Sequence, residues 1–499
     1  MRRRSLLLAP IVALAVGLPS APVAAEEGTH SPNMTHVVHH PSFQRTLEGA
    51  RAGGGTDIEF ATLPVETGVD ADGEPVVEDR DFALAGTYRN GLQIVDITDP
   101  TQPETASVYD CVIQQGDVQV FEREGRTYAT YTHDDPYNPT TTSQCYVEAR
   151  DLGLRPPGTP TSGTFIADIT DPYDPTTVSF VPEPRGSHNQ TVAPGGEFLY
   201  NSNSDLGNAQ TGQIEVFDIS DFSEPEKVKT LELETGLSSH DITFSEDGTR
   251  AYSAAVTHTV VLNTEDLANP TIVGRIIDPA VNIHHQSDPV TLTDATTGLE
   301  RTFLVVTDEV AGATPAGYCP GGGLHIYDIT GPLEAAPVKV GFWNIPSVKT
   351  LVSPDGDLGR CTSHVLRMYP EQKIMTIAWY SQGVRVVDLS GLVGVSAGAD
   401  ETAGNVGVGM KEIGYFYFPN SDTWAAKAYR IEEDGSFYIF GNDLNRGLDV
   451  YRFDSGAPAP EGTGTWLTPA QALARARTLG VGAGIQEGPF CLFAGITVA

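Results

Sequence analysis

Four histidines occupy one position in four copies of a repeated strand pair, and imidazole is a common ligand of transition metals. His188, His240 and His364 each stand seven residues before the turn of a predicted β-hairpin. A fourth copy opens with His284-His285 and has a longer turn, so we assign the position to His285, with His284 as the alternative. We therefore predict that His188, His240, His285 and His364 face a common point and bind copper, iron or zinc without any thiolate.

Acidic side chains are expected near the same point. In the second copy the histidine position falls on Asp117, and in the seventh it falls on Lys427. The second strand of each hairpin runs antiparallel to the first, so its end returns to the same side of the sheet and brings Asp308, Glu309 and Asp443 there. We predict catalytic roles for these four acids, with Asp117 or Glu309 as the proton acceptor.

The histidines belong to a chain that repeats one unit seven times. Each unit contains a strand of alternating β-branched residues that ends in a turn, usually at an aspartate, and most units begin with a pair of shorter strands. The repeated strands read GLQIVDITDPTQPE (91–104), GTFIADITDPYDPT (163–176), GQIEVFDISDFSEPE (212–226), HTVVLNTEDLANP (258–270), GLHIYDITGPLEAAP (323–337), GVRVVDLSG (383–391) and GLDVYRFDSG (447–456). Four short strands per unit, without helical periodicity, are typical of β-propeller blades.

We therefore predict an all-β fold, with a seven-bladed β-propeller over residues 57–456. The polar, His-rich residues 26–56 are predicted to form a short N-terminal arm. Residues 457–499 are predicted to be a linker and a helical, apolar C-terminal tail that packs on the propeller. Because the first strand of each blade lines the central channel, the histidines are expected at one mouth of that channel. A closed ring has little need of partner subunits, so we expect a monomer.

Residues 1–25 are predicted to be a signal peptide. Three arginines precede an apolar run, and Val23-Ala24-Ala25 provide a small-residue cleavage site. The start also resembles a twin-arginine signal, so the Sec and Tat routes of export both stay open. The mature protein is expected to be secreted or held at the cell surface.

The chain is strongly acidic, with a formal net charge of −35 at pH 7 over 499 residues. Nucleic acids and anionic lipids repel such a polyanion, so neither is an expected partner. No apolar run after the signal approaches the length of a membrane span. The expected partner is a small molecule, or a protein or glycan at a cell surface.

Five cysteines favour disulfides in an exported protein. Our preferred pairs are Cys111 with Cys145 and Cys319 with Cys361, which leaves Cys491 over, although five cysteines allow other pairings. The chain has no CxxC motif of the kind found in zinc–thiolate sites.

The repeats resemble the LVIVD-repeat family of secreted bacterial propellers, named for the strand that here reads LQIVD and VRVVD. The likeness covers nearly the whole mature chain and includes NMTHVVHHP, GSHNQTVAPGG, SSHDITF, TSHVLRMYP and GSFYIFGNDLNRGLDVYRF. It implies an extracellular propeller but no particular activity. The family pattern often has a second histidine where this chain has Gln190, so the resemblance does not carry a ligand role over to that position. The HD and HH pairs on inner strands are also similar to selenium-binding-protein or methanethiol-oxidase propellers, which implies copper-dependent oxidation of small thiols.

Two functions stay open on the sequence alone. The first is a metal-dependent oxidoreductase with copper or iron held by the four histidines. The second is a non-catalytic cell-surface or extracellular module for binding or adhesion, in which duplicated histidines only hydrogen-bond neighbouring blades. The long loops at residues 133–162 and 310–322 favour the second, because binding residues are common on loops.

Overall fold

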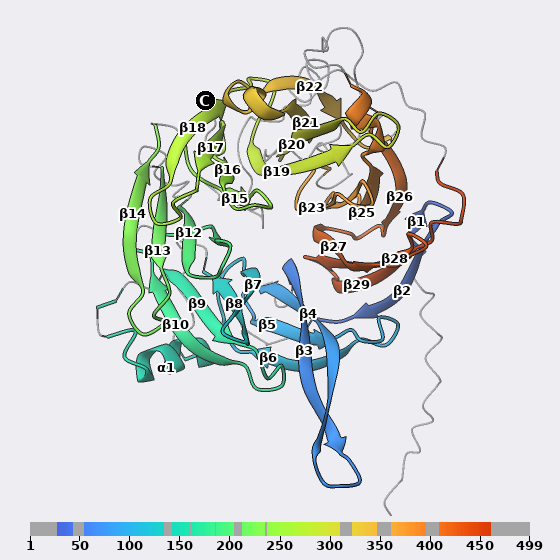
Figure 1. The fold of residues 1–499 in the computed structure, drawn as a ribbon. Coiled ribbons are helices and arrows are strands. Elements are labelled where there is room, and N and C mark those ends of the chain that lie inside the picture. Colours follow the sequence, from blue (N-terminus) through green and yellow to red (C-terminus); the bar gives the residue numbers. More distant parts are fainter. Residues whose placement is uncertain are drawn as a thin grey trace, which may run out of the picture.

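The computed structural model describes residues 27–42, 54–133, 142–156, 158–159, 162–184, 186–203, 212–234, 237–309, 322–346, 361–395 and 409–460. In this part of the chain, seven antiparallel sheets are arranged around a central axis (Figure 1). This confirms the prediction of a seven-bladed β-propeller. The predicted signal peptide and nearly all of the predicted C-terminal tail lie outside the described residues.

The strands follow one another from the channel outward in each blade. Blade 1 contains β3 (Gly54–Val69), β4 (Pro75–Tyr88), β5 (Leu92–Asp96) and β6 (Glu104–Tyr109). Blade 2 contains β7 (Asp117–Arg123), β8 (Arg126–Thr132), β9 (Gly163–Asp168) and β10 (Thr176–Pro182). Blade 3 contains β11 (Asn189–Val192), β12 (Phe198–Asn203), β13 (Gln213–Asp218) and β14 (Glu226–Glu232). Blades 4 and 5 contain β15 (Asp241–Phe244), β16 (Arg250–Ala254), β17 (Thr259–Asn263) and β18 (Thr271–Ile276), then β19 (His284–Thr293), β20 (Glu300–Asp308), β21 (Gly323–Asp328) and β22 (Val338–Trp343). Blades 6 and 7 contain β23 (Leu366–Tyr369), β24 (Ile374–Ala378), β25 (Val384–Asp388) and β26 (Lys411–Tyr417), then β27 (Thr423–Ile431), β28 (Phe437–Asp443) and β29 (Gly447–Phe453). Short helices are α1 (Gln144–Asp151) and two 3-10 turns at Gly331–Ala335 and Ser390–Gly394.

Strands from the N-terminal segment complete the last two blades. β2 (Met34–His40) pairs with β29 as the outer strand of blade 7, and β1 (Thr29–His30) pairs with β26 as a fifth strand of blade 6. These strands come from the segment that we predicted to be an arm. Because β2 joins the start of the chain to its last blade, its hydrogen bonds close the ring and cover an otherwise open sheet edge.

The repeated aspartate ends the third strand of most blades by a local hydrogen bond. In each case its Oδ1 accepts the backbone N–H two residues further on, which forms an Asx turn. The bonds are Asp96 to Thr98, Asp168 to Thr170, Asp218 to Ser220, Asp328 to Thr330 and Asp388 to Ser390, at 2.8–3.0 Å. The Asp-x-Thr/Ser pattern therefore marks the end of a strand.

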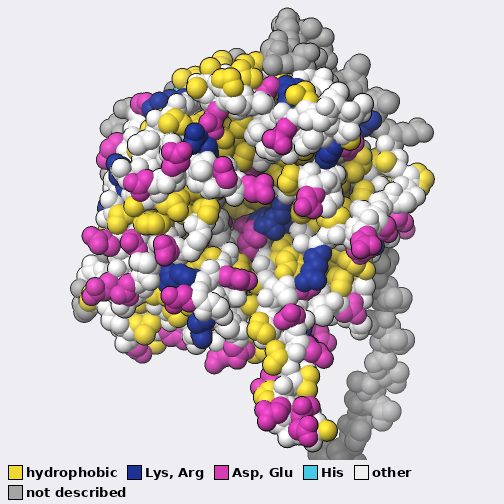
Figure 2. Space-filling model, viewed as in Figure 1, with side chains coloured by type: hydrophobic (Ala, Val, Ile, Leu, Met, Phe, Trp, Pro, Cys, Tyr) yellow, Lys and Arg dark blue, Asp and Glu magenta, His cyan; other side chains and the backbone are white. Residues whose placement is uncertain are grey.

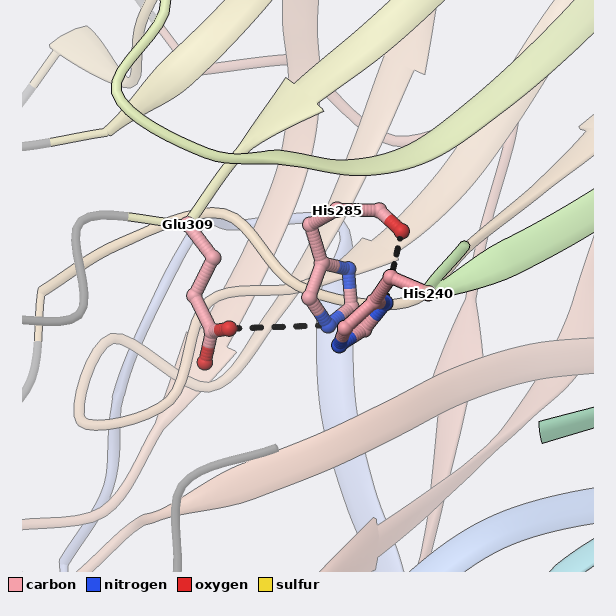
Figure 3. Close-up of side chains that lie close together, drawn as sticks. All are labelled: His240, His285 and Glu309. Carbon is pink, nitrogen blue, oxygen red and sulfur yellow. Dashed lines mark hydrogen bonds and ion pairs between the residues drawn. The ribbon is translucent and has the colours of Figure 1, made fainter. Parts of the chain in front are cut away.

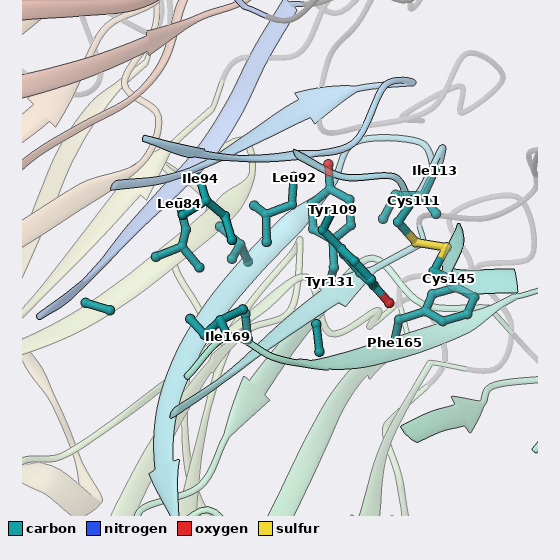
Figure 4. Packing of buried hydrophobic residues seen from close by; sticks show 14 of the residues in the cluster. Leu84, Leu92, Ile94, Tyr109, Cys111, Ile113, Tyr131, Cys145, Phe165 and Ile169 are labelled. Carbon is teal, nitrogen blue, oxygen red and sulfur yellow. A yellow bond between two sulfur atoms is a disulfide. The ribbon is translucent and has the colours of Figure 1, made fainter. Parts of the chain in front are cut away.

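Apolar side chains fill the spaces between blades. The cluster between blades 1 and 2 includes Leu84, Ile94 and Phe165, and the Cys111–Cys145 disulfide lies at its edge (Figure 4). This confirms the first predicted disulfide. Cys361 is also disulfide-bonded, and its predicted partner Cys319 lies outside the described residues. Within the described residues, no helix has the length and apolar character needed to cross a membrane.

Replacing Cys111 with serine is expected to lower the free energy of unfolding by about 3–4 kcal/mol, because the bond closes a loop of 34 residues. Thermal unfolding without reductant measures the loss. The double variant Cys111→Ser/Cys145→Ser should lose about as much as the single variant, since both remove one and the same bond. A loss below about 1 kcal/mol would show that the disulfide adds little to the packed blades.

Candidate metal centre

Three of the predicted histidines are anchored by the same backbone hydrogen bond. Each stands at the entry to its inner strand and donates its backbone N–H to the end of the second strand of the same blade. The bonds run from His188 to Ser202 O, from His240 to Ala254 O and from His364 to Ala378 O, at 2.8–3.0 Å. Equivalent anchors in blades 3, 4 and 6 direct the three imidazoles toward one region of the channel.

His285 joins them, and His284 does not. The pairing of β19 with β20 shifts register between His284 and Gln286, so two residues oppose one at this point. His284 then faces blade 4, where its Nδ1 lies 2.8 Å from Thr259 Oγ1. The side chain of His285 lies beside that of His240 (Figure 3).

The four imidazoles form a continuous buried arc. Ring centroids are 4.2 Å apart for His188 and His240, 4.4 Å for His240 and His285, and 4.3 Å for His285 and His364. All four side chains belong to residues that are at most 2 % exposed. The histidines therefore form a buried arc at this end of the channel.

Glu309 supplies a carboxylate to this arc. It directly follows β20, and its Oε2 lies 3.7 Å from His285 Nε2 (Figure 3), while its Oε1 lies 3.8 Å from His364 Nε2. One ligand atom each from His240, His285 and Glu309 lie within 4.8 Å of one another. Two imidazoles and a carboxylate at this spacing can be drawn onto one metal ion by small side-chain movements.

Backbone carbonyls fix the tautomer of two imidazoles. His240 Nδ1 lies 3.0 Å from the carbonyl oxygen of His285, and His364 Nδ1 lies 2.6 Å from that of Trp424. A carbonyl only accepts hydrogen bonds, so each Nδ1 carries the proton and each Nε2 keeps its lone pair. Such a bond orients a metal-binding histidine and makes it more basic.

The inward nitrogens of two histidines form no hydrogen bond with the described part of the chain. Neither His240 Nε2 nor His285 Nε2 has a hydrogen-bond partner there. Burial lowers the pKa of His188 to about 3. Burial and the neighbouring imidazoles also hold the pKa values of His240 and His285 well below 6.5. The imidazoles are therefore neutral near pH 7, which is the form that binds a metal.

Two of the predicted acids lie outside this group and brace loops. Asp308 accepts the backbone N–H groups of Asn282 and Ile283 at 3.0 and 2.9 Å, which fixes the chain just before His284-His285. Asp443 accepts the Thr423 hydroxyl at 2.9 Å and so fixes the start of β27. Both carboxylates accept hydrogen bonds from neighbouring segments, and their predicted catalytic roles gain no support from this placement.

Asp117 faces a cavity of about 600 Å³ that occupies the channel next to the histidine arc. His285 and Trp424 line it near the starts of the inner strands, and Pro194, Glu246 and Pro370 line it beyond their ends. The cavity therefore runs along the channel from the histidine arc toward the opposite mouth. Figure 2 shows the centre of one face hollowed, with acidic and basic side chains meeting there.

Most of a layer of charged residues in this cavity was missed by the sequence analysis, which named only Asp117 and Lys427. This layer contains the acidic side chains of Asp57, Glu59, Asp117, Asp241 and Asp288 and the basic ones of Arg367 and Lys427. Lys427 Nζ lies 2.7 Å from Asp57 and 2.8 Å from Glu59. The one available signal was Asp241, which directly follows a predicted ligand in the motif SSHDITF.

Burial raises the pKa values of several of these acids toward or into the neutral range. It raises the pKa of Asp117 well above its usual range, with the charge of Asp57 adding to the effect. Burial and Asp288 raise the pKa of Asp241 to about 7, and burial raises that of Asp288 to about 6. These groups can donate as well as accept hydrogen bonds, and Asp241 can exchange a proton close to pH 7.

Tyr380 holds Glu309 from a strained backbone position. Its φ of 41° lies in the left-handed region, which bulky residues rarely adopt and which is common at functional sites. Its hydroxyl donates to Glu309 Oε1 at 2.7 Å, and its ring lies 4.5 Å from that of His364. The strain therefore places a donor directly on the carboxylate of the candidate site.

Replacing Tyr380 with phenylalanine is expected to weaken metal binding by about 10–100-fold without unfolding the protein, because a partner that orients a ligand is lost. Competition with a chelator of known affinity measures the dissociation constant. An unchanged constant would mean that Glu309 does not bind the metal or does not need Tyr380 to orient it.

No protein-family model matches this chain, and no curated protein matches it significantly. Many solved structures are similar to it, among them the following three. A protein of unknown function from Desulfotomaculum acetoxidans DSM 771 is 14 % identical over 70 % of this chain and 88 % of its own, with a TM-score of 0.40. The periplasmic gluconolactonase of Pseudomonas aeruginosa is 12 % identical over 66 % and 78 %, with a TM-score of 0.38. A chain in the mitotic checkpoint complex is 9 % identical over 89 % and 100 %, with a TM-score of 0.42.

These likenesses carry no argument about activity, ligand or partner, because both the identities and the TM-scores are low. The resemblance to LVIVD-repeat proteins accordingly stays a prediction. The function has to be argued from the side chains of the channel.

Proposed function

We propose that this protein is an exported propeller of the LVIVD type that binds one transition-metal ion through His240, His285 and Glu309 and acts as a metal-dependent oxidoreductase. The observation that carries the proposal is the pair of buried Nε2 atoms, neither with a hydrogen bond to the described residues, on neutral imidazoles beside a carboxylate. Two histidines and one carboxylate are the donor set of mononuclear non-haem iron sites, so iron is the first expectation and copper the second.

The residues around this set have separable tasks. His188 and His364 lie on either side of the ligands and seal them from solvent. Tyr380 fixes Glu309, which as a ligand is not available as the proton acceptor. A bound metal supplies Lewis acidity and a site for oxygen or substrate. The cavity then admits a small polar molecule, and Asp117 and Asp241 exchange protons with it.

The second candidate is a binding module in which the histidines only join blades. The Nδ1 bonds favour it, because His240 bonds a carbonyl of blade 5 and His364 bonds one of blade 7. This explanation accounts for one nitrogen of each ring. It leaves the inward Nε2 atoms of His240 and His285 buried without a hydrogen bond to the described residues, which costs free energy that a metal would recover.

Elemental analysis of protein purified from the medium without chelators tests the proposal, followed by removal and return of the metal. We expect about one iron or copper per chain. Oxygen uptake with a panel of small thiols, alcohols and amines should stop on metal removal and resume when the metal is restored. Protein that neither contains nor takes up a transition metal would favour the binding module.

A further inference from the structure

Four buried side-chain oxygens at the contact between blades 2 and 3 lack a hydrogen-bond partner among the described residues. They are Glu183 Oε2, Gln190 Oε1, Asn201 Oδ1 and Asn203 Oδ1. All four residues are fully buried. A single buried acceptor without a donor is already unfavourable, so four in one place need an explanation.

Strand register brings these groups together. Gln190 on β11 lies directly opposite Asn201 on β12, and Asn201 lies opposite Glu215 on β13, so the three side chains share one face of blade 3. Asn203 lies two residues along from Asn201 and therefore points to the same face. Glu183, which follows β10 of blade 2, accepts a hydrogen bond from Gln190 Nε2 at 2.5 Å across the blade contact.

The amide nitrogens are already occupied, which fixes the direction of each oxygen. Gln190 Nε2 also donates to Ser187 Oγ, at 3.2 Å. Asn201 Nδ2 donates to Gly186 O and to Glu215 Oε2, both at 3.1 Å, and Asn203 Nδ2 donates to Glu215 Oε2 at 3.3 Å. Turning any of these amides round would break bonds on the nitrogen side. The three unpaired amide oxygens are thus fixed as acceptors.

A hard cation satisfies such a set better than water does. A water molecule donates only two hydrogen bonds, whereas the site offers four unpaired oxygens. It also contains a second carboxylate, Glu215, whose Oε1 accepts a hydrogen bond from Lys227 Nζ at 2.8 Å. The atoms that could bind a metal here are all oxygens of carboxylates and amides, and such ligands do not favour soft metals. Calcium takes six to eight oxygens of these kinds in flexible geometry, whereas magnesium demands a strict octahedron.

We propose that a calcium ion binds between blades 2 and 3 and is coordinated by the side-chain oxygens of Glu183, Gln190, Asn201 and Asn203. The site is separate from the transition-metal centre but adjoins it, because Gly186 and Ser187 of its surroundings precede His188 directly.

Thermal unfolding and calorimetric titration of the full-length, calcium-free protein with calcium chloride test the proposal. We expect one high-affinity calcium ion per chain and a melting temperature that rises by about 3 °C at a hundredfold excess over Kd. Glu183→Gln keeps the shape of the side chain, so this variant should melt like the chelated wild type and show no response to calcium.

Two controls separate this site from others. Asp70→Asn alters an exposed acidic turn whose carboxylate already accepts the backbone N–H groups of Asp72 and Glu74, so it should bind calcium as the wild type does. Glu183→Gln should also keep its iron or copper, which distinguishes a failure here from a failure of the proposed function. A wild type that does not bind calcium, or a Glu183→Gln variant that binds it equally well, would overturn the proposal.

Discussion

Replacing His285 with alanine is expected to reduce the iron or copper content from about one ion per chain to less than a tenth, and to abolish metal-dependent activity. His285 is central to the arc, since its ring contacts those of His240 and His364 and its Nε2 faces Glu309. Loss of a group that only orients a ligand weakens metal sites about 10–100-fold, so loss of the ligand itself should exceed about 10³-fold. Elemental analysis and chelator competition measure the two quantities.

The adjacent histidine provides a matched control. His284 is equally buried and differs by one position in sequence, but it faces Thr259 in blade 4 and not the channel. His284→Ala should therefore lose stability and keep its metal. Glu309→Gln should behave like His285→Ala, since an amide is a poor ligand in place of a carboxylate. Equal metal content in the His284 and His285 variants would contradict the assignment.

Replacing Asp449 with asparagine is expected to destabilise the propeller by about 3–5 kcal/mol, because a buried carboxylate with several charged or polar partners is lost. Asp449 is fully buried on β29. Its Oδ1 lies 2.8 Å from His36 Nε2 and 3.1 Å from His39 Nδ1, and its Oδ2 accepts Arg446 Nε at 2.6 Å. These bonds clamp β2 to blade 7, so the loss falls on the strand that closes the ring.

Thermal and urea unfolding measure this loss, with the exposed Asp454→Asn on the same chain segment as the control. Burial alone would raise the pKa of Asp449, but hydrogen bonds from His36, His39 and Arg446 together hold it well below its usual range. Its contribution is thus complete above the unfolded pKa of about 3.9 and is lost only in stronger acid. A variant within about 0.5 kcal/mol of the wild type would show that β2 does not depend on this clamp.

The repeat made the fold predictable, and a shared position in the repeat located the histidines. The repeat length and the alternation of apolar and polar residues within each unit are local in sequence. They therefore predict each blade and the direction of its inner strand. The choice between His284 and His285 rests on a bulge in β19, which depends on pairing with β20 and has no local signal. The pairing of β2 with β29 joins the two ends of the propeller and could not be read from local pattern either.

The acids were harder to assign than the histidines. Glu309, Asp308 and Asp443 all come at or just after the ends of second-strand or hairpin segments, and the sequence treats them alike. Only Glu309 turns toward the imidazoles, because the other two carboxylates accept backbone or hydroxyl donors of neighbouring loops. A carboxylate at this position can either accept hydrogen bonds from the nearest loop or turn toward the channel. Which of the two it does depends on the geometry of that loop.

The most direct measurement is anomalous X-ray diffraction from crystals loaded with iron(II) or copper, recorded on both sides of the absorption edge of the metal. The account predicts one peak about 2.0–2.2 Å from His240 Nε2, His285 Nε2 and a Glu309 oxygen, typical lengths for such bonds. An absent peak, with ordered water hydrogen-bonded to both Nε2 atoms, would contradict the metal centre and make the histidine arc a structural element of the propeller.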